Sequence, residues 1–386
     1  MRQNKSIIYV NFAPYENAGR ILDFLIENFT LVILFSFDFH ELKNYHSNQI
    51  KIFCDGKIIQ EIKLFKLPTP EFLLFPTIPL IAFIIALQTI WYVLSFKRVY
   101  GKFHAHLTVN AFTAWIGNLL KNFRIVDKSI FWVWDYYPPS DPNWKIRIVR
   151  WVYWKFDKIS TKSSSSVIFL NKRLEDLRKE IGILPKNSFY PIVPIGTNPR
   201  KTFFYKKTVI GHIGVLKKSQ GLDLLFNNLA EISKNVSNLK VEILGSGPDE
   251  QYFKLRAKRF SNVKFYGFIE EDDQVDQIIK NWSIGLATYI PEKSNGAYWT
   301  DPSKIKLYIS QGVPVIATEI TGFADEIRKN KAGIVIDYYD AKGFTNAILN
   351  IIKNKNTFIK NSYDLSIKYN YRKIYKQLFN FPTKTG

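Results

Sequence analysis

The chain has 386 residues, enough for two domains with complete hydrophobic cores. Hydrophobic residues make up 46% of it and aromatic residues 16%, which excludes a disordered protein, while the single cysteine excludes an intramolecular disulfide and a cysteine-rich metal site. The formal net charge of +21 predicts a partner of opposite sign, which can be nucleic acid, anionic lipid or a phosphorylated substrate.

The first segment is expected to form a βαβ unit. The N-terminus carries no apolar run long enough for a signal peptide, and Ile7–Asn11 is typical of a first strand. A loop ending at Gly19 and Arg20 leads to an expected helix, Ile21–Asn28, and a second strand, Leu31–Phe35. Gly19 and Arg20 are candidates for holding an acceptor or a phosphate, and ordinary loop-to-helix punctuation is the alternative.

The stretch Phe72–Phe96 contains no charged residue and is long enough to cross a bilayer as a helix. The strands on its two sides belong to one alternating βα pattern, and a bilayer cannot divide a sheet. Pro76 and Pro79 are expected to break the front of the stretch, so that the helix begins at Leu80. We expect this helix to lie in or against the membrane interface, with a helix buried in the protein as the alternative.

A second stretch, Trp144–Phe156, alternates aromatic residues with Lys145, Arg147, Arg150 and Lys155. Aromatic and basic side chains on one helix suit the lipid headgroup region, where rings lie at the boundary and cations meet phosphates. The same composition is compatible with binding single-stranded nucleic acid, or with a packed helix that has a solvated basic face.

Ile130–Pro139 is predicted to be a strand that ends in a rigid aromatic turn. Asp135 emerges at the carboxyl end of this strand, where parallel sheets bind ligands. We expect Asp135 to contact the acceptor or the transferred sugar and to take a proton, with Tyr136 beside it on the acceptor side. A structural aspartate that caps the turn is the alternative.

Phe189–Arg200 contains three prolines and a glycine and is the expected linker between two domains. The expected organisation is an N-terminal domain over residues 1–195, a second domain over 205–365 and a C-terminal helix within 366–386.

The second half repeats strand and helix more regularly than the first. Two consecutive doubly wound series predict an α/β protein with two Rossmann-like domains facing a cleft. The strands predicted for the second series are Val209–Ile213, Val241–Leu244, Val263–Tyr266, Ile284–Ala287, Val315–Ala317 and Gly333–Ile336.

Two strand-to-helix turns in the second half are rich in glycine. Gly214–Gly221 carries Lys217 and Lys218, and glycines there let the backbone approach a diphosphate that lysine neutralises. Gly245 and Gly247 form the second turn, for which ligand contact and close backbone packing are equally good interpretations.

A third anion site is predicted at a helix that begins near Ser303. Pro302 is expected at the first helical position, and Asp301 or Thr300 as the cap. The free N–H groups of that helix, its dipole and the ammonium of Lys304 converge on one place, where we expect a nucleotide diphosphate to bind.

Together these segments resemble the second domain of the large retaining family of GT-B glycosyltransferases, the glycosyl transferases group 1. The resemblance implies the GT-B fold, a hexosyl-transferring enzyme, a nucleotide-sugar donor bound mainly by the second domain and an acceptor held by the first. It also implies that no metal or cofactor is required and that the C-terminal helix crosses back to the first domain. The matching segments are Gly214 with Gly221–Asp223, Ile243–Glu250, Asn262–Ile269 (with Phe268 in the donor-binding set), Asp301–Thr318 and Gly322–Ile327.

The phosphate loop departs from the family pattern at two positions. The family usually has an arginine after the first glycine and a lysine before the second, and these positions hold Val215 and Gln220. Lys217 or Lys218 must therefore substitute if the loop still binds phosphate.

The paired glutamates of the family, eight positions apart, are absent too. Their positions correspond to Trp299 and Leu307, which leaves Asp301 and Lys304 as the nearest replacements. In the first domain, the histidine that often precedes the aspartate is Trp134.

The function expected from the sequence is transfer of a sugar from a nucleotide-diphosphate sugar to a glycan or lipid-linked acceptor at the membrane surface, in polysaccharide or glycolipid assembly. We expect a cytoplasmic protein, peripheral on the inner face of the membrane. Lys304, the N–H groups near Ser303 and one loop lysine are expected to relieve charge on the leaving diphosphate. A nucleotide-sugar epimerase and a non-catalytic GT-B-like binding protein are the alternatives. A nucleic-acid partner is not expected, because it explains the charge but not the two βα series.

Overall fold

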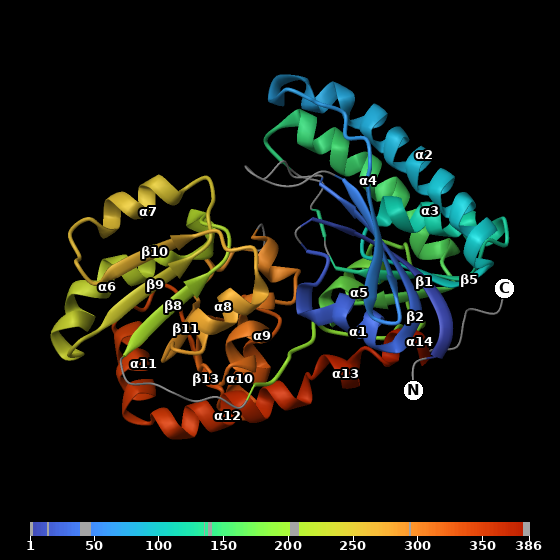
Figure 1. The fold of residues 1–386 in the computed structure, drawn as a ribbon. Helices are drawn as coiled ribbons and strands as arrows, with labels where there is room; N and C mark the ends of the chain where they lie inside the picture. The colour runs from blue at the N-terminus through green and yellow to red at the C-terminus, as the bar shows by residue number, and fades with distance from the viewer. Residues whose placement is uncertain are drawn as a thin grey trace. The chain divides into compact units, whose positions relative to one another are not determined.

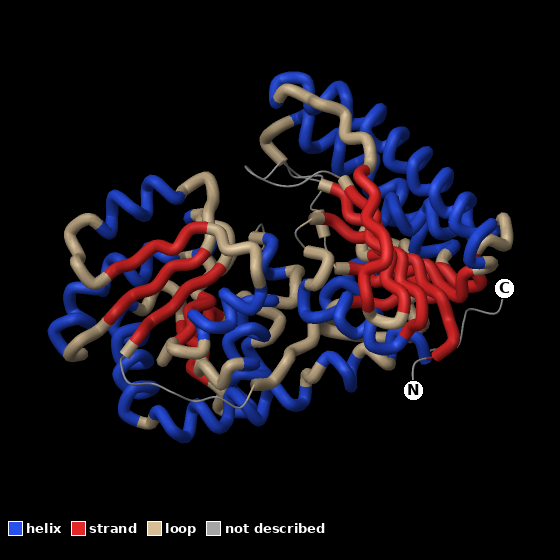
Figure 2. Tube along the Cα trace, viewed as in Figure 1, coloured by secondary structure: helices blue, strands red, loops and turns tan. Residues whose placement is uncertain are grey.

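The structure is a computed structural model and describes residues 3–13, 15–38, 48–134, 136–137, 141–200, 208–292 and 295–380. The chain divides into two compact units, unit 1 (Met1–Pro194 with Ile374–Gly386) and unit 2 (Ile195–Lys373). Each unit is an α/β body built on one sheet, as Figures 1 and 2 show. The expected α/β class with two Rossmann-like bodies is confirmed.

Unit 1 contains a seven-stranded sheet in the order β4-β3-β2-β1-β5-β6-β7. All neighbouring strands from β2 to β7 are parallel, whereas β3 and β4 form an antiparallel edge. The strands are β1 (Gln3–Phe12), β2 (Phe29–Phe37), β3 (Gln49–Cys54), β4 (Lys57–Lys63), β5 (Phe103–Thr108), β6 (Val126–Val133) and β7 (Ser166–Phe169).

The β3–β4 hairpin is absent from the sequence-based expectation. Its turn is Asp55-Gly56, and both residues have positive φ, 50° and 85°. Asp-Gly is the typical two-residue hairpin turn, so the signal was present in the sequence. β4 is almost wholly exposed and begins and ends with Lys57 and Lys63, which discourages pairing at this edge.

The helices of unit 1 lie on both faces of its sheet. Figure 1 shows α2, α3 and α4 on one face and α1 with the C-terminal α14 on the other. The helices are α1 (Ile21–Asn28), α2 (Leu74–Tyr100), α3 (Ala111–Asn122), α4 (Trp144–Ser163), α5 (Lys172–Glu180) and α14 (Gln377–Asn380).

Helix α2 is longer than the sequence predicts, because neither proline breaks its front. Pro76 lies in the first turn, where a backbone N–H has no helical partner to lose. Pro79 lies further inside, and the helix continues through it. Within the described chain, α2 is the one helix long and apolar enough to cross a membrane, and only 17% of its apolar window is buried. A helix buried in the protein, the alternative interpretation, is therefore wrong for α2.

Unit 2 contains a six-stranded, wholly parallel sheet in the order β10-β9-β8-β11-β12-β13. Every strand predicted for this half is present, and the bounds agree within one residue at each end. The strands are β8 (Val209–Ile213), β9 (Lys240–Leu244), β10 (Val263–Gly267), β11 (Ile284–Ala287), β12 (Val315–Thr318) and β13 (Gly333–Ile336).

Two apolar cores lie on the two faces of this sheet. One is formed with α6 and α11, the other with α8, α9 and α10. Gly211 in the middle of β8 is required by the second core, since a Cβ there would lie 1.9 Å from the indole of Trp282. The helices are α6 (Leu222–Asn235), α7 (Glu250–Ala257), α8 (Asp272–Ile279), α9 (Ser303–Ser310), α10 (Ala324–Asn330), α11 (Ala341–Lys353) and α12 (Lys355–Lys368).

The segment 366–386, where one C-terminal helix is expected, holds the end of α12 and two short helices. After α12 the backbone leaves the helix, because Tyr369 accepts a hydrogen bond from the N–H of Thr197 and Tyr371 donates one to the Thr197 carbonyl. Two short helices follow, α13 (Tyr371–Ile374) and α14.

Replacing Gly211 with alanine is expected to destabilise unit 2 by about 1–3 kcal/mol, because the added methyl overlaps the buried Trp282 ring. Gly296→Ala is the matched control, since a Cβ at Gly296 meets nothing within 4 Å. Chemical denaturation measures both variants, and equal midpoints for the two would contradict the packing argument.

Candidate functional site

The candidate site lies where the chain of unit 2 changes direction across the sheet. β8 and β11 are neighbours, β8 continues to β9 on one side and β11 continues to β12 on the other. The loops after β8 and β11 therefore diverge at the carboxyl edge of the sheet, which is where open α/β sheets bind ligands.

The loop after β8 runs close to the loop after β9. A Cβ on Gly245 would lie 2.0 Å from the carbonyl oxygen of Gly214, and one on Gly247 would lie 2.6 Å from the backbone nitrogen of Leu216. Gly245 and Gly247 thus allow this close approach, as the packing interpretation of that turn requires. Gly214 has φ 137°, a conformation that glycine adopts without strain.

The loop after β11 holds the same glycine loop from its other side. The Ser219 carbonyl accepts hydrogen bonds from the N–H of Ile290 at 3.1 Å and from Asn295 Nδ2 at 2.9 Å. Thr288 Oγ1 donates to the Gly221 carbonyl at 3.2 Å. Gly214–Gly221 is therefore fixed in position before any ligand arrives.

Lys304, the second residue of α9, extends its amine to this loop. Nζ donates to Gln220 Oε1 at 2.8 Å and lies 4.7 Å from the centre of the Tyr289 ring. A Cβ on Gly214 would lie 3.2 Å from Nζ, a tight contact that glycine avoids. In the described part of the chain, the amine has no carboxylate partner.

Burial sets the protonation of Lys304. Loss of water around the buried side chain lowers its pKa to about 7. Its ammonium also helps to lower the pKa of the buried His212, after the larger effect of burial. An anion placed beside Nζ would supply the missing negative charge, which makes the site suited to a phosphate group.

The start of α9 differs from the expected cap. Pro302 is the N-cap residue itself, with φ −72° and ψ 95°, and no side chain caps the helix. The expectation that Asp301 or Thr300 caps it is wrong. Asp301 Oδ2 instead accepts from the N–H of Ile195 at 2.8 Å and from Lys306 Nζ at 3.1 Å. Ser303, next along the chain, is exposed.

Lys306 is a structural lysine. Besides Asp301, its amine bonds the Ile195 carbonyl at 3.2 Å and lies about 4 Å from the ring centres of Phe323 (4.1 Å) and Tyr369 (4.0 Å). Burial lowers its pKa, and the Asp301 carboxylate opposes that shift. The Asp301 carboxylate thus has a charged partner inside unit 2, whereas the partner of the Lys304 amine in the described chain is the neutral amide of Gln220.

The other donor-side candidates are farther from Lys304 or more exposed. Lys217 is exposed on the loop, and Lys218 lies 4.4 Å from the centre of the Tyr252 ring while its N–H bonds Asp249. Phe268 is exposed after β10, the outer strand of the sheet.

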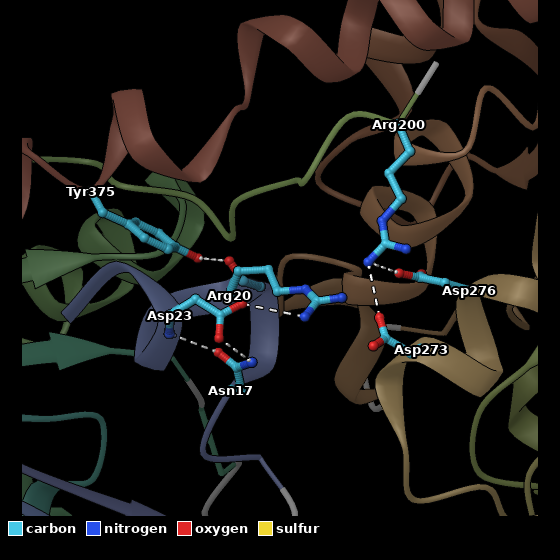
Figure 3. Close-up of polar contacts among 8 residues, drawn as sticks. Asn17, Arg20, Asp23, Arg200, Asp273, Asp276 and Tyr375 are labelled. Carbon is cyan, nitrogen blue, oxygen red and sulfur yellow. Dashed lines mark hydrogen bonds and ion pairs between the residues drawn. The ribbon is translucent and has the colours of Figure 1, made fainter. Parts of the chain in front are cut away.

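On the acceptor side, Gly19 and Arg20 follow β1 at the switch point of unit 1, between β1 and β5. Figure 3 shows Arg20 Nη1 paired with Asp23 at 3.3 Å, and Tyr375 Oη donating to the Gly19 carbonyl at 2.8 Å. Gly19 and Arg20 have positive φ, 64° and 65°.

Asp135, the proposed proton acceptor, lies outside the described residues. Tyr136 is described: its ring meets Trp154 edge-on at 5.4 Å, and burial raises its pKa.

Figure 3 also shows Arg200 of unit 2, the last residue of the expected linker. Its guanidinium bonds Asp273 at 3.1 Å and Asp276 at 2.9 Å and so attaches the end of the linker to α8.

Sequence reasoning missed Gln220 and Tyr289 as partners of Lys304. Gln220 was noted only as a departure from the family pattern, although it stands where the family has a loop lysine. Tyr289 comes two residues after β11, and a strand end followed by an aromatic residue was the available signal.

The buried amine predicts a pH dependence of stability. Between about pH 7 and the ordinary range of lysine, the unfolded chain holds the Lys304 proton and the folded chain does not. The free energy of unfolding therefore rises with pH in this window, by up to about 1.4 kcal/mol per pH unit from this group. Lys304→Met should remove this contribution, and the control Lys342→Met, at an exposed position, should keep it. Denaturant titration from pH 6.5 to 10 measures both, roughly the window between the pKa of Lys304 in the folded chain and the ordinary pKa of lysine. Identical slopes for Lys304→Met and the parent protein would contradict the burial argument.

Comparison with known proteins covers the two units unequally. Residues 207–354 match the family model described as glycosyl transferases group 1. No curated protein matches the sequence at a significant level.

Several solved structures share the fold at low sequence identity. Sucrose-phosphate synthase (tll1590) from Thermosynechococcus elongatus has a TM-score of 0.66 at 16% identity, with 97% of each chain covered. WaaG, a glycosyltransferase involved in lipopolysaccharide biosynthesis, has 0.55 at 15%, covering 78% of this chain and 96% of its own. The S. aureus TarM G117R mutant, solved with Fondaparinux, alpha-GlcNAc-glycerol and UDP, has 0.53 at 17%, covering 72% of this chain. The chain spans about half of TarM, 55%.

The family match covers most of unit 2, and the fold match extends over both units. The chain therefore has the GT-B fold, and residues 207–354 of its second unit match the glycosyl transferases group 1.

Proposed function

We propose that unit 2 binds a nucleotide-diphosphate sugar at the β8–β11 switch point, and that the sugar passes to a glycan or lipid-linked acceptor bound by unit 1. The observation that carries this proposal is the buried Lys304 amine, which lies beside a glycine loop without a carboxylate partner in the described chain. UDP is the first nucleotide to test, since TarM was solved with UDP. The acceptor side rests on Gly19, Arg20, Asp135 and Tyr136.

In the proposed reaction the bond between the anomeric carbon and the diphosphate oxygen breaks, and a bond to an acceptor oxygen forms. Negative charge collects on the leaving diphosphate, and Lys304 with the N–H groups at the start of α9 stabilises it. An acceptor hydroxyl loses its proton to a base, for which Asp135 is the candidate, whereas an acceptor phosphate oxygen is already ionised and needs no base. The charge relief comes from the protein's own groups, so the proposal requires no metal ion.

Gln220 adds support from the family pattern. It occupies the position of the usual loop lysine, and the Lys304 amine lies 2.8 Å from its amide oxygen. The cation missing from the loop is thus replaced, near the same place, by a cation from α9. The paired glutamates are absent from the same helix region, which fits a binding site that was rearranged rather than lost.

We further propose that unit 1 attaches to the cytoplasmic face of an anionic membrane through α2 and α4. One face of α2 exposes large apolar side chains, including Trp91 (67% exposed) and Phe83 (62%), and α4 exposes Trp151 (60%). The N-terminal ends of α2 and α4 are in contact, because the ring of Phe75 packs edge-on against the ring of Trp144 with 5.4 Å between their centres.

Charge around this surface favours anionic lipid. α2 contains no acidic residue and ends with Lys97 and Arg98. In α4 the one acidic residue, Asp157, is fully buried and paired with Arg178, so the exposed charges of this helix are all basic. Basic and aromatic side chains together bind headgroup phosphates at the interface.

Lys304→Met is expected to weaken UDP-glucose binding about 10- to 100-fold, the effect of losing a hydrogen bond to a charged group of about 1.5–3 kcal/mol. Isothermal titration calorimetry measures this, with Lys342→Met on the exposed face of α11 as the control. Turnover should fall far more than thermal stability. Unchanged affinity and turnover in Lys304→Met would overturn the donor site.

Affinity for UDP-glucose should also fall as pH rises above about 7, because the free protein then loses the Lys304 proton that the bound diphosphate favours. The fall is at most tenfold per pH unit. Titration in buffers of different ionisation enthalpy should show proton uptake on binding at pH 8, roughly one unit above that pKa. Proton uptake that persists in Lys304→Met would assign the effect to another group.

Replacing Phe83 and Trp91 together with glutamate should abolish binding to vesicles that contain phosphatidylserine, because both side chains are exposed on α2 and their loss leaves the core intact. Leu255→Glu, at an equally exposed apolar residue of unit 2, is the control. Vesicle flotation at low and high salt measures binding. Equal flotation of the double variant and the control would refute membrane attachment through α2.

A further inference from the structure

Unit 1 contains a cavity of about 240 Å³ that the proposed sugar transfer does not use. It lies between α2, the first turns of α4 and the segment that follows β4. In the wall from α2, Leu74, Ile78, Ile81 and Ile85 recur at the spacing of one helix face, and Ile84 lies beside them. Val149 of α4 closes the opposite side.

The size and lining of the cavity select the class of ligand. An apolar cavity of about 150 Å³ stays dry and binds benzene, so this larger one holds a longer hydrocarbon segment. Pockets for drug-sized ligands are about 300–1,000 Å³, so a nucleotide does not fit entirely. Sugar hydroxyls would also find almost no hydrogen-bond partners among the aliphatic side chains.

The polar lining of the cavity consists of Lys66, Asn48 and Asp38. Asp38 follows β2 at the carboxyl edge of the sheet. Lys66 Nζ lies 2.9 Å from Asp38 Oδ2, and the side chain of Lys66 is 32% exposed while that of Asp38 is 1% exposed. An ammonium has three donors, so Lys66 has further donors for a phosphate oxygen. The buried Asp38 carboxylate opposes an anion deeper inside, which favours an amphiphile with its phosphate at Lys66 and its chain in the cavity.

We propose that this cavity binds the hydrocarbon chain of a lipid-phosphate acceptor. The inference rests on the proposed function and specifies its acceptor as an amphiphile. The two faces of α2 then have separate tasks. Its outer face, with Phe83 and Trp91, contacts the bilayer, and its inner face receives one chain segment drawn from it. The volume admits only part of a long chain, and the rest of the chain stays in the membrane.

The test uses decyl phosphate below its micelle concentration, with the full chain and isothermal titration calorimetry. The parent protein should bind decyl phosphate at least tenfold more tightly than butyl phosphate, which has the same headgroup and a shorter chain. Val149→Trp fills the cavity and should weaken decyl phosphate binding at least tenfold. Val152→Trp places the same ring on the same helix at an exposed position that does not line the cavity, and should bind as the parent does.

Three outcomes would overturn the inference. They are no binding of decyl phosphate by the parent, equal binding of butyl and decyl phosphate, or unchanged binding in both Val149→Trp and a second cavity-filling variant, Ile78→Trp. Circular dichroism and thermal melting establish that each variant is folded. If Val149→Trp lowers vesicle binding by the same factor as decyl phosphate binding, the cavity holds a bilayer lipid and the acceptor assignment is wrong. UDP-glucose binding by unit 2 is measured in parallel, so that failure here with intact donor binding leaves the proposed glycosyl transfer standing.

Discussion

The arrangement of unit 2 depends on the cost of holding the Lys304 amine away from water. Burial lowers its pKa to about 7, and no carboxylate among the described residues offsets that cost. Three neighbouring residues accommodate it: Gly214 leaves space for Nζ, the Gln220 side chain accepts its hydrogen bond and Tyr289 offers a ring face. Structural lysines are usually paired when buried. A lysine without a carboxylate partner at the carboxyl edge of a parallel sheet fits the proposed binding of an anion from outside the chain.

The neighbouring lysine shows the contrast within the same short helix. Lys306 is as buried as Lys304, but Asp301, the Ile195 carbonyl and two aromatic rings surround it. Residues two apart on a helix point to nearly opposite sides. The helix α9 (Ser303–Ser310) therefore secures the first residues of unit 2 with one side and presents an amine to the glycine loop with the other. Asp301 belongs to the first task, and this explains why it does not cap the helix.

The sequence predicted the architecture of unit 2 well because its strands are short apolar runs, each followed by a polar or glycine-bearing loop, and such signals are local. The same locality explains what was missed. Gln220, one partner of Lys304, lies 84 residues away along the chain. No short-range sequence pattern links Gln220 to Lys304. The Asp55-Gly56 hairpin was available as a local signal and was overlooked. At α2, proline was given its usual helix-breaking role, whereas Pro76 falls in the first turn and loses nothing.

Pro79 has a consequence for the cavity beside α2. Pro79 has no N–H, so it cannot donate a hydrogen bond to the carbonyl of Phe75. The first turn of α2 is therefore held to the rest of the helix by one backbone hydrogen bond fewer than an ordinary helical turn. That turn carries Leu74, and Ile78 lies immediately before the proline. This end of the cavity wall can therefore shift at lower energetic cost than the end at Ile85, so the proposed hydrocarbon ligand would enter there without unwinding the part of the helix that packs on the sheet.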